Sequence, residues 1–83
     1  MSSSVKFPSV KARKMRAILR GLGYRAIPGM GKGSHTVLRC DGRGNIMFAY
    51  HDKATVSGMR VKKMLTTEAG MTLDEAKKVM GIA

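Results

Sequence analysis

Apolar residues near the start of the chain recur at helical spacing. Four of them fall at i, i+3, i+4 and i+7 and form one stripe: Met15, Ile18, Leu19 and Leu22. Such a stripe is typical of a helix that buries one side, and most of the basic residues between 11 and 20 lie off it. The pattern predicts a basic amphipathic helix over residues 10–22. Ser9 is the expected N-cap, and Gly23 the glycine that follows the last turn.

The middle of the chain has the patterns of short strands separated by turn residues. Residues 24–27 alternate weakly and end at Pro28, and residues 34–40 contain side chains that favour extended structure. The segment 41–45, Asp-Gly-Arg-Gly-Asn, is typical of a hairpin turn. Residues 46–50 are nearly all apolar, so we expect this third strand to be the central or most buried one.

Two further helices are expected after residue 56. The first covers residues 57–68, turns Val61, Met64 and Leu65 inward, and ends at Gly70. Thr72 and Glu75 then have the spacing of a capping box, which predicts a short C-terminal helix that stops at Gly81. The inward side of this helix is expected to consist of Leu73, Ala76 and Met80.

This order of elements predicts an α+β fold. Strands joined by tight turns form a three-stranded antiparallel sheet, and the helices must cover one of its faces. The expected layout is an α-β-β-β-α sandwich like that of double-stranded-RNA-binding domains, with a short extra helix at the C-terminus and one open sheet face. Residues 1–8 are interpreted as a disordered lead-in, and residues 9–83 as a single domain.

Charge points to a polyanionic partner. The net charge of the 83 residues is +11, and residues 1–40 hold nine basic residues and no acidic one. Such an excess is expected of a nucleic-acid-binding domain, with Lys11, Arg13 and Lys14 of the first helix among the candidate RNA contacts; the alternative is a basic surface that serves solubility alone. One cysteine, no signal-peptide pattern and no apolar run of membrane-spanning length predict a cytoplasmic protein without membrane contact.

His35 is the main candidate for catalysis. It opens the second strand after the small residues Gly33 and Ser34, and on strand parity it shares a face with Arg39, opposite Leu38. If Leu38 points towards the helices, His35 and Arg39 project from the open face. Histidine exchanges protons near neutral pH, and Lys32 and Arg39 could hold a phosphate beside it.

Other chemistries have weaker support. No pair of metal ligands has a recognisable motif spacing, so no metal or other cofactor is expected. Cys40 shares the parity of Leu38 and is expected to point into the core, and the glycines around Lys32 lack the full pattern of a nucleotide-binding loop. His51 is a second candidate catalytic group, although a structural histidine bonded to the backbone or to Asp52 is the favoured interpretation.

On these residues the chain resembles the HicA family, the toxin half of HicA–HicB toxin–antitoxin systems. The resemblance covers about residues 9–76 and is sharpest at Lys32-Gly33-Ser34-His35, which is similar to the family's Gly-Ser-His signature. It implies a metal-independent endoribonuclease, an mRNA interferase, with His35 as its catalytic residue and a HicB antitoxin as its protein partner. The sequence departs from the family in the glycine-rich segment 28–31 and in the added helix after Thr72.

Two other functions fit the same composition. A non-catalytic RNA-binding module of the same fold would bind RNA without cutting it. A DNA-binding or nucleoid protein would use the basic helix on the phosphate backbone and would not depend on the 2′-hydroxyl of RNA. A cleavage assay and a comparison of DNA with RNA separate these three functions.

Overall fold

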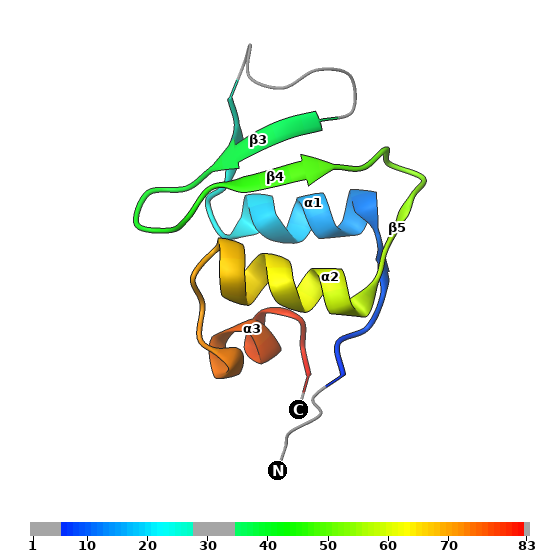
Figure 1. Ribbon diagram of the computed structural model, residues 1–83, viewed down its shortest axis with the longest axis vertical. Coiled ribbons are helices and arrows are strands. Elements are labelled where there is room, and N and C mark those ends of the chain that lie inside the picture. The colour runs from blue at the N-terminus through cyan, green and yellow to red at the C-terminus, as the bar shows by residue number, and fades with distance from the viewer. Residues whose placement is uncertain (1–5, 28–34, 83) are drawn as a thin grey trace.

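The computed structural model describes residues 6–27 and 35–82 (Figure 1). The strands are β1 (Val10–Lys11), β2 (Arg25–Ala26), β3 (His35–Arg39), β4 (Ile46–Ala49) and β5 (Thr55–Val56). The helices are α1 (Ala12–Gly21), α2 (Gly58–Lys63), a π-helical continuation η1 (Met64–Glu68) and α3 (Leu73–Val79). The chain is therefore an α+β fold that contains the expected helix, three-stranded sheet and C-terminal helices, together with two short strands, β1 and β5, that were not expected.

The three-stranded sheet has the antiparallel order β2-β3-β4. In its register Thr36 lies opposite Phe48, and Leu38 lies opposite both Ile46 and Ala26. The strand 46–50 was expected to be the central or most buried one. It is not central, because consecutive hairpins place β3 in the middle and leave β4 at an edge, but it is the most buried strand of this sheet. Its apolar character still has a structural reason, since Ile46 and Phe48 are completely buried on one face of β4.

Helices cover one face of this sheet. Leu38, Ile46 and Phe48 belong to the same buried cluster as the inward side chains of the helices, namely Met15, Leu19, Val61, Met64 and Leu65. Figure 1 shows α1 next to β4, with α2 and α3 following away from the sheet. The apolar positions predicted for the first two helices are thus confirmed as core positions for all but two residues. Leu22 is partly buried against the core, and Ile18 is partly buried but does not belong to the cluster.

The start of α1 differs from the prediction. Residues 10–11 form a strand that pairs with β5, and Lys11, in extended conformation, occupies the N-cap position expected for Ser9. The first helical N–H groups donate to backbone carbonyls instead of a capping side chain, from Ala12 to Ala54 at 2.8 Å and from Arg13 to Asp52 at 3.4 Å. A tertiary strand pairing therefore replaces the local cap that the sequence suggested.

The lead-in expected over residues 1–8 falls partly outside the described residues. Within the described part, Phe7 is buried in the core. A Cβ at Gly58 would collide with the Phe7 carbonyl, so the N-terminal segment packs directly against the start of α2. Phe7 therefore belongs to the core, because α2 supplies a surface that the local sequence does not show.

The C-terminal helices follow the prediction closely. Ser57 caps α2 by accepting a hydrogen bond from the Arg60 N–H, and the capping box of Thr72 and Glu75 is present at the start of α3. Gly70 and Gly81 both have positive φ where the helices end. Within the described part of the chain, none of the helices has the length and apolar character required to cross a bilayer.

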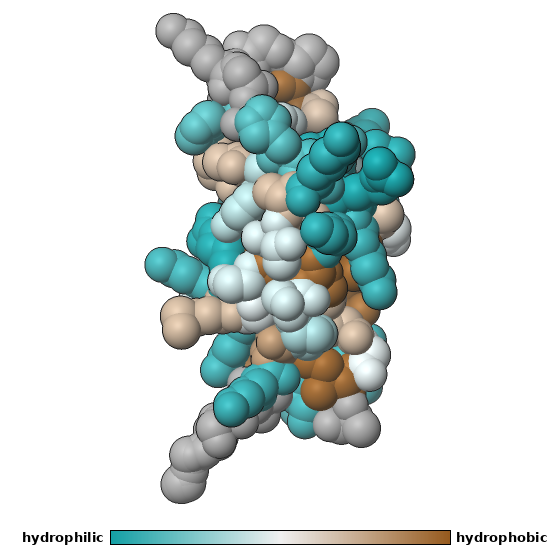
Figure 2. Space-filling view, turned by 90° about the vertical axis from the view of Figure 1, so that its right-hand side faces the viewer, coloured by the Kyte–Doolittle hydropathy of each residue, from teal (hydrophilic) through white to brown (hydrophobic). Residues whose placement is uncertain are grey.

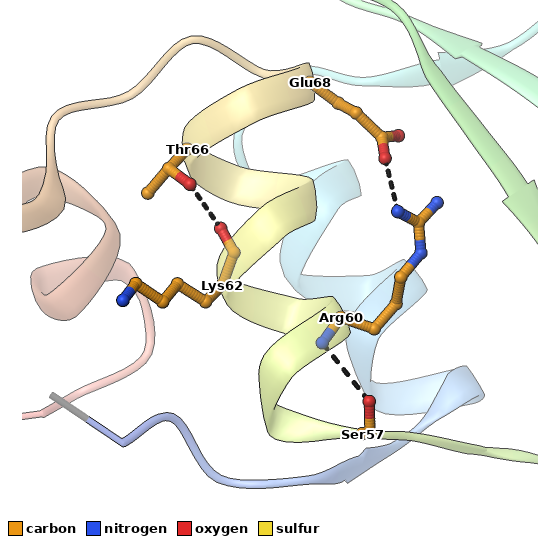
Figure 3. Close-up of polar contacts among 5 residues, drawn as sticks. All are labelled: Ser57, Arg60, Lys62, Thr66 and Glu68. Carbon is orange, nitrogen blue, oxygen red and sulfur yellow. Dashed lines mark hydrogen bonds and ion pairs between the residues drawn. The ribbon is translucent and has the colours of Figure 1, made fainter. Parts of the chain in front are cut away.

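One ion pair joins the two ends of the second helical segment. The Arg60 guanidinium donates to the Glu68 carboxylate at 2.6 Å, with both side chains largely covered (Figure 3). Partial burial acts to lower the pKa of Arg60, but the interactions with Glu68 and Tyr50 together outweigh it and raise that pKa. Thr66 donates to the Lys62 carbonyl in the same stretch, so the π-helical turn is held by side chains as well as by packing.

Candidate functional site

The open face of the sheet carries the residues singled out for chemistry. In the observed register His35 lies opposite Ala49, Val37 opposite Met47, and Arg39 opposite Arg25. Opposite residues in an antiparallel pair share a face, and the alternation places these side chains away from Leu38 and Phe48. The parity argument that put His35 and Arg39 on one face, opposite Leu38, is therefore confirmed.

His35 is exposed at the first position of β3. Its cross-strand neighbour Ala49 has only a methyl group, which leaves the imidazole accessible from that side. An accessible imidazole can approach a phosphodiester and exchange a proton with it. The other signature positions, Lys32, Gly33 and Ser34, lie outside the described residues.

Arg39 lies at the other end of β3. Four residues along a strand correspond to about 13 Å between the Cα atoms of His35 and Arg39, and Val37 lies between them on the same face. Arg39 instead adjoins Arg25 in a cleft of about 610 Å³. The two predicted site residues thus share a face but lie at opposite ends of β3.

The basic residues predicted on the first helix belong to another surface. Lys11, Arg13 and Lys14 are exposed, but α1 packs on the covered side of the sheet through Met15 and Leu19. Lys11 belongs to β1 and not to the helix. The structure therefore does not bring these three cations to the open face with His35.

Arg16 shows that part of the basic helix has a structural role. Its guanidinium pairs with Asp52 at 2.7 Å and lies 5.3 Å from the centre of the Phe48 ring. It also lies 3.4 Å from the Tyr50 carbonyl oxygen. These contacts close the edge of the core beside β4, so Arg16 is engaged by the fold in a way that the exposed Arg13 is not.

Hydrophilic residues gather in the upper part of the face seen in Figure 2, at the level of the sheet and α1, and hydrophobic residues show through lower down. Arg13, Arg16, Arg20 and Asp52 line a shallow cleft of about 350 Å³ on α1. This cationic surface is a second region that a polyanion could meet, separate from the open sheet face.

His51 lies in the turn after β4 and is exposed. It comes two residues after Ala49, the partner of His35, so both histidines lie at the same end of the hairpin. The expected bond to Asp52 is absent among the described residues, since Asp52 pairs with Arg16, and no hydrogen bond of the His51 side chain occurs there. Its backbone carbonyl accepts from the Ala54 N–H at 2.9 Å.

Cys40 is half-buried and packs against the core, as its parity with Leu38 predicted. Its sulfur lies 3.5 Å from the Leu22 carbonyl oxygen, and a Cβ at Gly23 would approach it to 3.3 Å. Across residues 6–27 and 35–82, no three His, Cys, Asp or Glu side chains are grouped so that they could hold a metal ion.

Sequence reasoning missed Arg25 and the support beneath the 41–45 turn. Arg25 becomes a site residue only through its register with Arg39, which the weak pattern of residues 24–27 could not fix. The turn is held from below by Tyr24, whose hydroxyl donates to the Gly44 carbonyl at 2.7 Å. Burial of Tyr24 raises its pKa. An aromatic residue directly after the helix-ending glycine was the signal available for this contact.

The site is thus one sheet face with a histidine at one end, a pair of arginines at the other, and apolar side chains between them. Comparison of the chain with protein-family models, with curated proteins and with solved structures gives no match.

Proposed function

We propose that this protein binds RNA across the open face of its sheet and cleaves it, with His35 as general acid or base. The observation that carries the proposal is the exposed imidazole of His35 on the same face as two arginines that have no ion-pair partner among the described residues. A net charge of +11 supports a polyanionic substrate.

The chemistry requires little from the protein. RNA carries its own nucleophile, because the 2′-hydroxyl oxygen can attack the adjacent phosphorus while the bond to the 5′-oxygen breaks. A proton leaves the 2′-hydroxyl and another reaches the 5′-oxygen, so a single histidine can serve one or both transfers. General acid–base catalysis of this kind contributes roughly 10²–10⁴-fold.

The fold supports the same conclusion by analogy. A three-stranded antiparallel sheet covered by helices on one face has the layout of double-stranded-RNA-binding domains, although a fold alone does not determine function. The resemblance of residues 32–35 to the HicA signature adds the specific activity, an mRNA interferase, and a HicB-like antitoxin as partner. An acidic antitoxin surface would complement the cationic face and block His35.

The test is incubation of the purified protein with a defined RNA in excess EDTA, beside His35→Ala and His35→Gln proteins. We expect the wild type to cut and both variants to lose roughly 10²–10⁴-fold in cleavage rate. Lys78→Gln is the control, because Lys78 is exposed on α3, remote from the sheet. A folded His35→Ala protein with wild-type activity would refute the proposal.

The second candidate function is RNA binding without cleavage. It has the same support from charge and from the open face, and it assigns no role to His35. If the wild type and His35→Ala both bind RNA, and neither cuts it while both are folded, the binding module is the correct function. Equal affinity for DNA of the same sequence would instead favour a DNA-binding protein.

A further inference from the structure

The end of β3 remote from His35 carries two arginines that face each other. Arg25 and Arg39 are direct partners in the β2–β3 ladder, and both are exposed. The Ile27 N–H donates to the Val37 carbonyl directly opposite at 3.0 Å. Because hydrogen-bonded and non-hydrogen-bonded pairs alternate, Arg25 and Arg39 also form a hydrogen-bonded pair, with Cα atoms about 5.5 Å apart.

The pairing of two arginines lowers the stability of the sheet, and no ion pair among the described residues compensates for it. Like charges directly opposite in a sheet destabilise it. The ion pairs among the described residues are Arg16–Asp52 and Arg60–Glu68, and neither includes Arg25 or Arg39. Residues 1–5, 28–34 and 83 contain no aspartate or glutamate that could serve instead. The two guanidinium charges are therefore not neutralised by an ion pair with any carboxylate of the described residues.

The surrounding cleft has room for a ligand. Its volume is about 610 Å³, and besides the two arginines its lining includes Gly23, Ile27 and Asp41. Asp41 is exposed and makes no ion pair with either arginine. A volume of this size can hold a nucleotide-sized group. Two arginines on directly opposite positions of neighbouring strands can contact one phosphate together, since each guanidinium group presents a planar fork of donors.

We propose that Arg25 and Arg39 form a phosphate-binding subsite for an RNA strand, separate from the position of cleavage. This inference rests on the proposed function and adds to it the path of the substrate. The strand crosses the open face along β3, with the scissile phosphate at His35 and another phosphate, about 13 Å along the strand direction, between the arginines. Val37, Ile27 and Met47 lie between these two points and contact the sugars and bases.

The open face lacks an aromatic platform, which strengthens the role of phosphate contacts. All four aromatic residues, Phe7, Tyr24, Phe48 and Tyr50, are buried or half-buried. Phe48 and Tyr50 pack edge to face with each other, with ring centres 5.5 Å apart. Base stacking on aromatic rings, the usual source of sequence-tolerant affinity, is therefore unavailable on this face within the described residues.

The test measures binding of a fluorescein-labelled, fully 2′-O-methylated RNA, which cannot be cleaved because its nucleophile is blocked. We compare the wild type with Arg25→Gln, Arg39→Gln, the double variant, Arg25→Lys and the charge-matched control Lys78→Gln. Each of the two single arginine-to-glutamine variants is expected to bind about tenfold or more weakly and to reduce the salt dependence of log K by about one. Arg25→Lys should restore only part of the affinity, because it keeps the charge and loses the fork.

If both arginines contact the same phosphate, the losses of binding free energy in the two single variants should not add up in the double variant. The double variant should bind scarcely more weakly than either single variant, because the second substitution removes a contact that is already broken. Urea unfolding of every variant shows that each is folded.

Several outcomes would overturn the subsite. Wild-type affinity in Arg25→Gln would do so, and would leave the pair free to meet an acidic protein surface instead. Equal losses in Arg25→Gln and Lys78→Gln would show that only net charge matters. Cleavage of unmodified RNA is scored separately. A wild type that binds without cutting refutes the ribonuclease but keeps the subsite, and one that cuts while Arg25→Gln binds normally refutes the subsite alone.

Discussion

The two faces of the β3–β4 hairpin differ in how far neighbouring residues are exposed to solvent. Leu38, Ile46 and Phe48 are buried against the helices, with at most 5% of their surface exposed. Their sequence neighbours point the other way, and Met47, between two completely buried residues, is 45% exposed. One strand thus supplies the core and the candidate site at once.

In this short chain, the residues that stabilise the fold and the residues proposed to bind a ligand lie on opposite faces of the same strands. Side chains on the covered face are fixed by packing, so their replacement should change the free energy of unfolding. Those on the open face contact solvent and each other, so their replacement should change ligand binding with little effect on folding. A chain of 83 residues has little spare stability, and alternation lets it place a costly charge pair without disturbing the core.

The largest expected difference lies between two consecutive residues of β4. Phe48→Ala should lower the free energy of unfolding by about 3–5 kcal/mol, because it leaves a cavity beneath the sheet. Met47→Ala should change it by no more than about 0.5 kcal/mol. Urea unfolding followed by circular dichroism measures both. If Phe48→Ala is wholly unfolded, Phe48→Leu gives a milder loss, and equal losses at the two positions would contradict the two-face description.

A smaller effect is expected where the 41–45 turn is anchored. Tyr24→Phe removes the hydrogen bond to the Gly44 carbonyl and should lower the free energy of unfolding by about 1 kcal/mol at neutral pH. Burial raises the pKa of Tyr24 above its ordinary value of 10.0, so the neutral phenol is the form that stabilises the fold. This contribution is complete below pH 10.0 and is lost as the pH rises through the raised pKa.

The check is a pair of urea titrations of the wild type and Tyr24→Phe, at neutral pH and on the alkaline side of the tyrosine pKa. The difference between the two proteins removes the effects of lysine and cysteine titration, which both share. It should be greatest at neutral pH and shrink in alkali. A difference that grows with pH would show that the phenolate, and not the phenol, is bound by the fold.

The smallest effect should have the opposite sign. Arg25→Gln relieves the repulsion from Arg39 and should raise the free energy of unfolding by up to about 0.5 kcal/mol. His35→Ala should change it by less than that, because the side chain is exposed. Thermal unfolding at low ionic strength resolves the difference best, since salt screens the repulsion. Destabilisation by Arg25→Gln would mean that Arg25 supports the sheet and carries no charge cost.

Local patterns were sufficient for much of the fold. The helical stripe through Met15 and Leu19 and the capping box at Thr72 each act within one or two turns, so the sequence shows them directly. The failures have a common cause. β4 at the sheet edge, the β1–β5 pairing and the burial of Phe7 all depend on partners distant in the chain.

The candidate site divides in the same way. Strand alternation alone placed His35 and Arg39 on one face, because the side-chain period of a strand is fixed by its geometry. The sequence could not show which residues of the neighbouring strands lie beside each of them. The partner of Arg39 is Arg25, and register is set by pairing between strands and not by either strand alone.

The sequence by itself thus determined the kinds of element, the inward faces of the helices and the excess of positive charge, since these follow from periodicity and composition. Only the tertiary structure decided which strand is central, which groups accept hydrogen bonds from the start of α1, and that Arg25 lies opposite Arg39. Those outcomes are contacts between segments that are separate in the chain, and only packing in three dimensions brings such segments together.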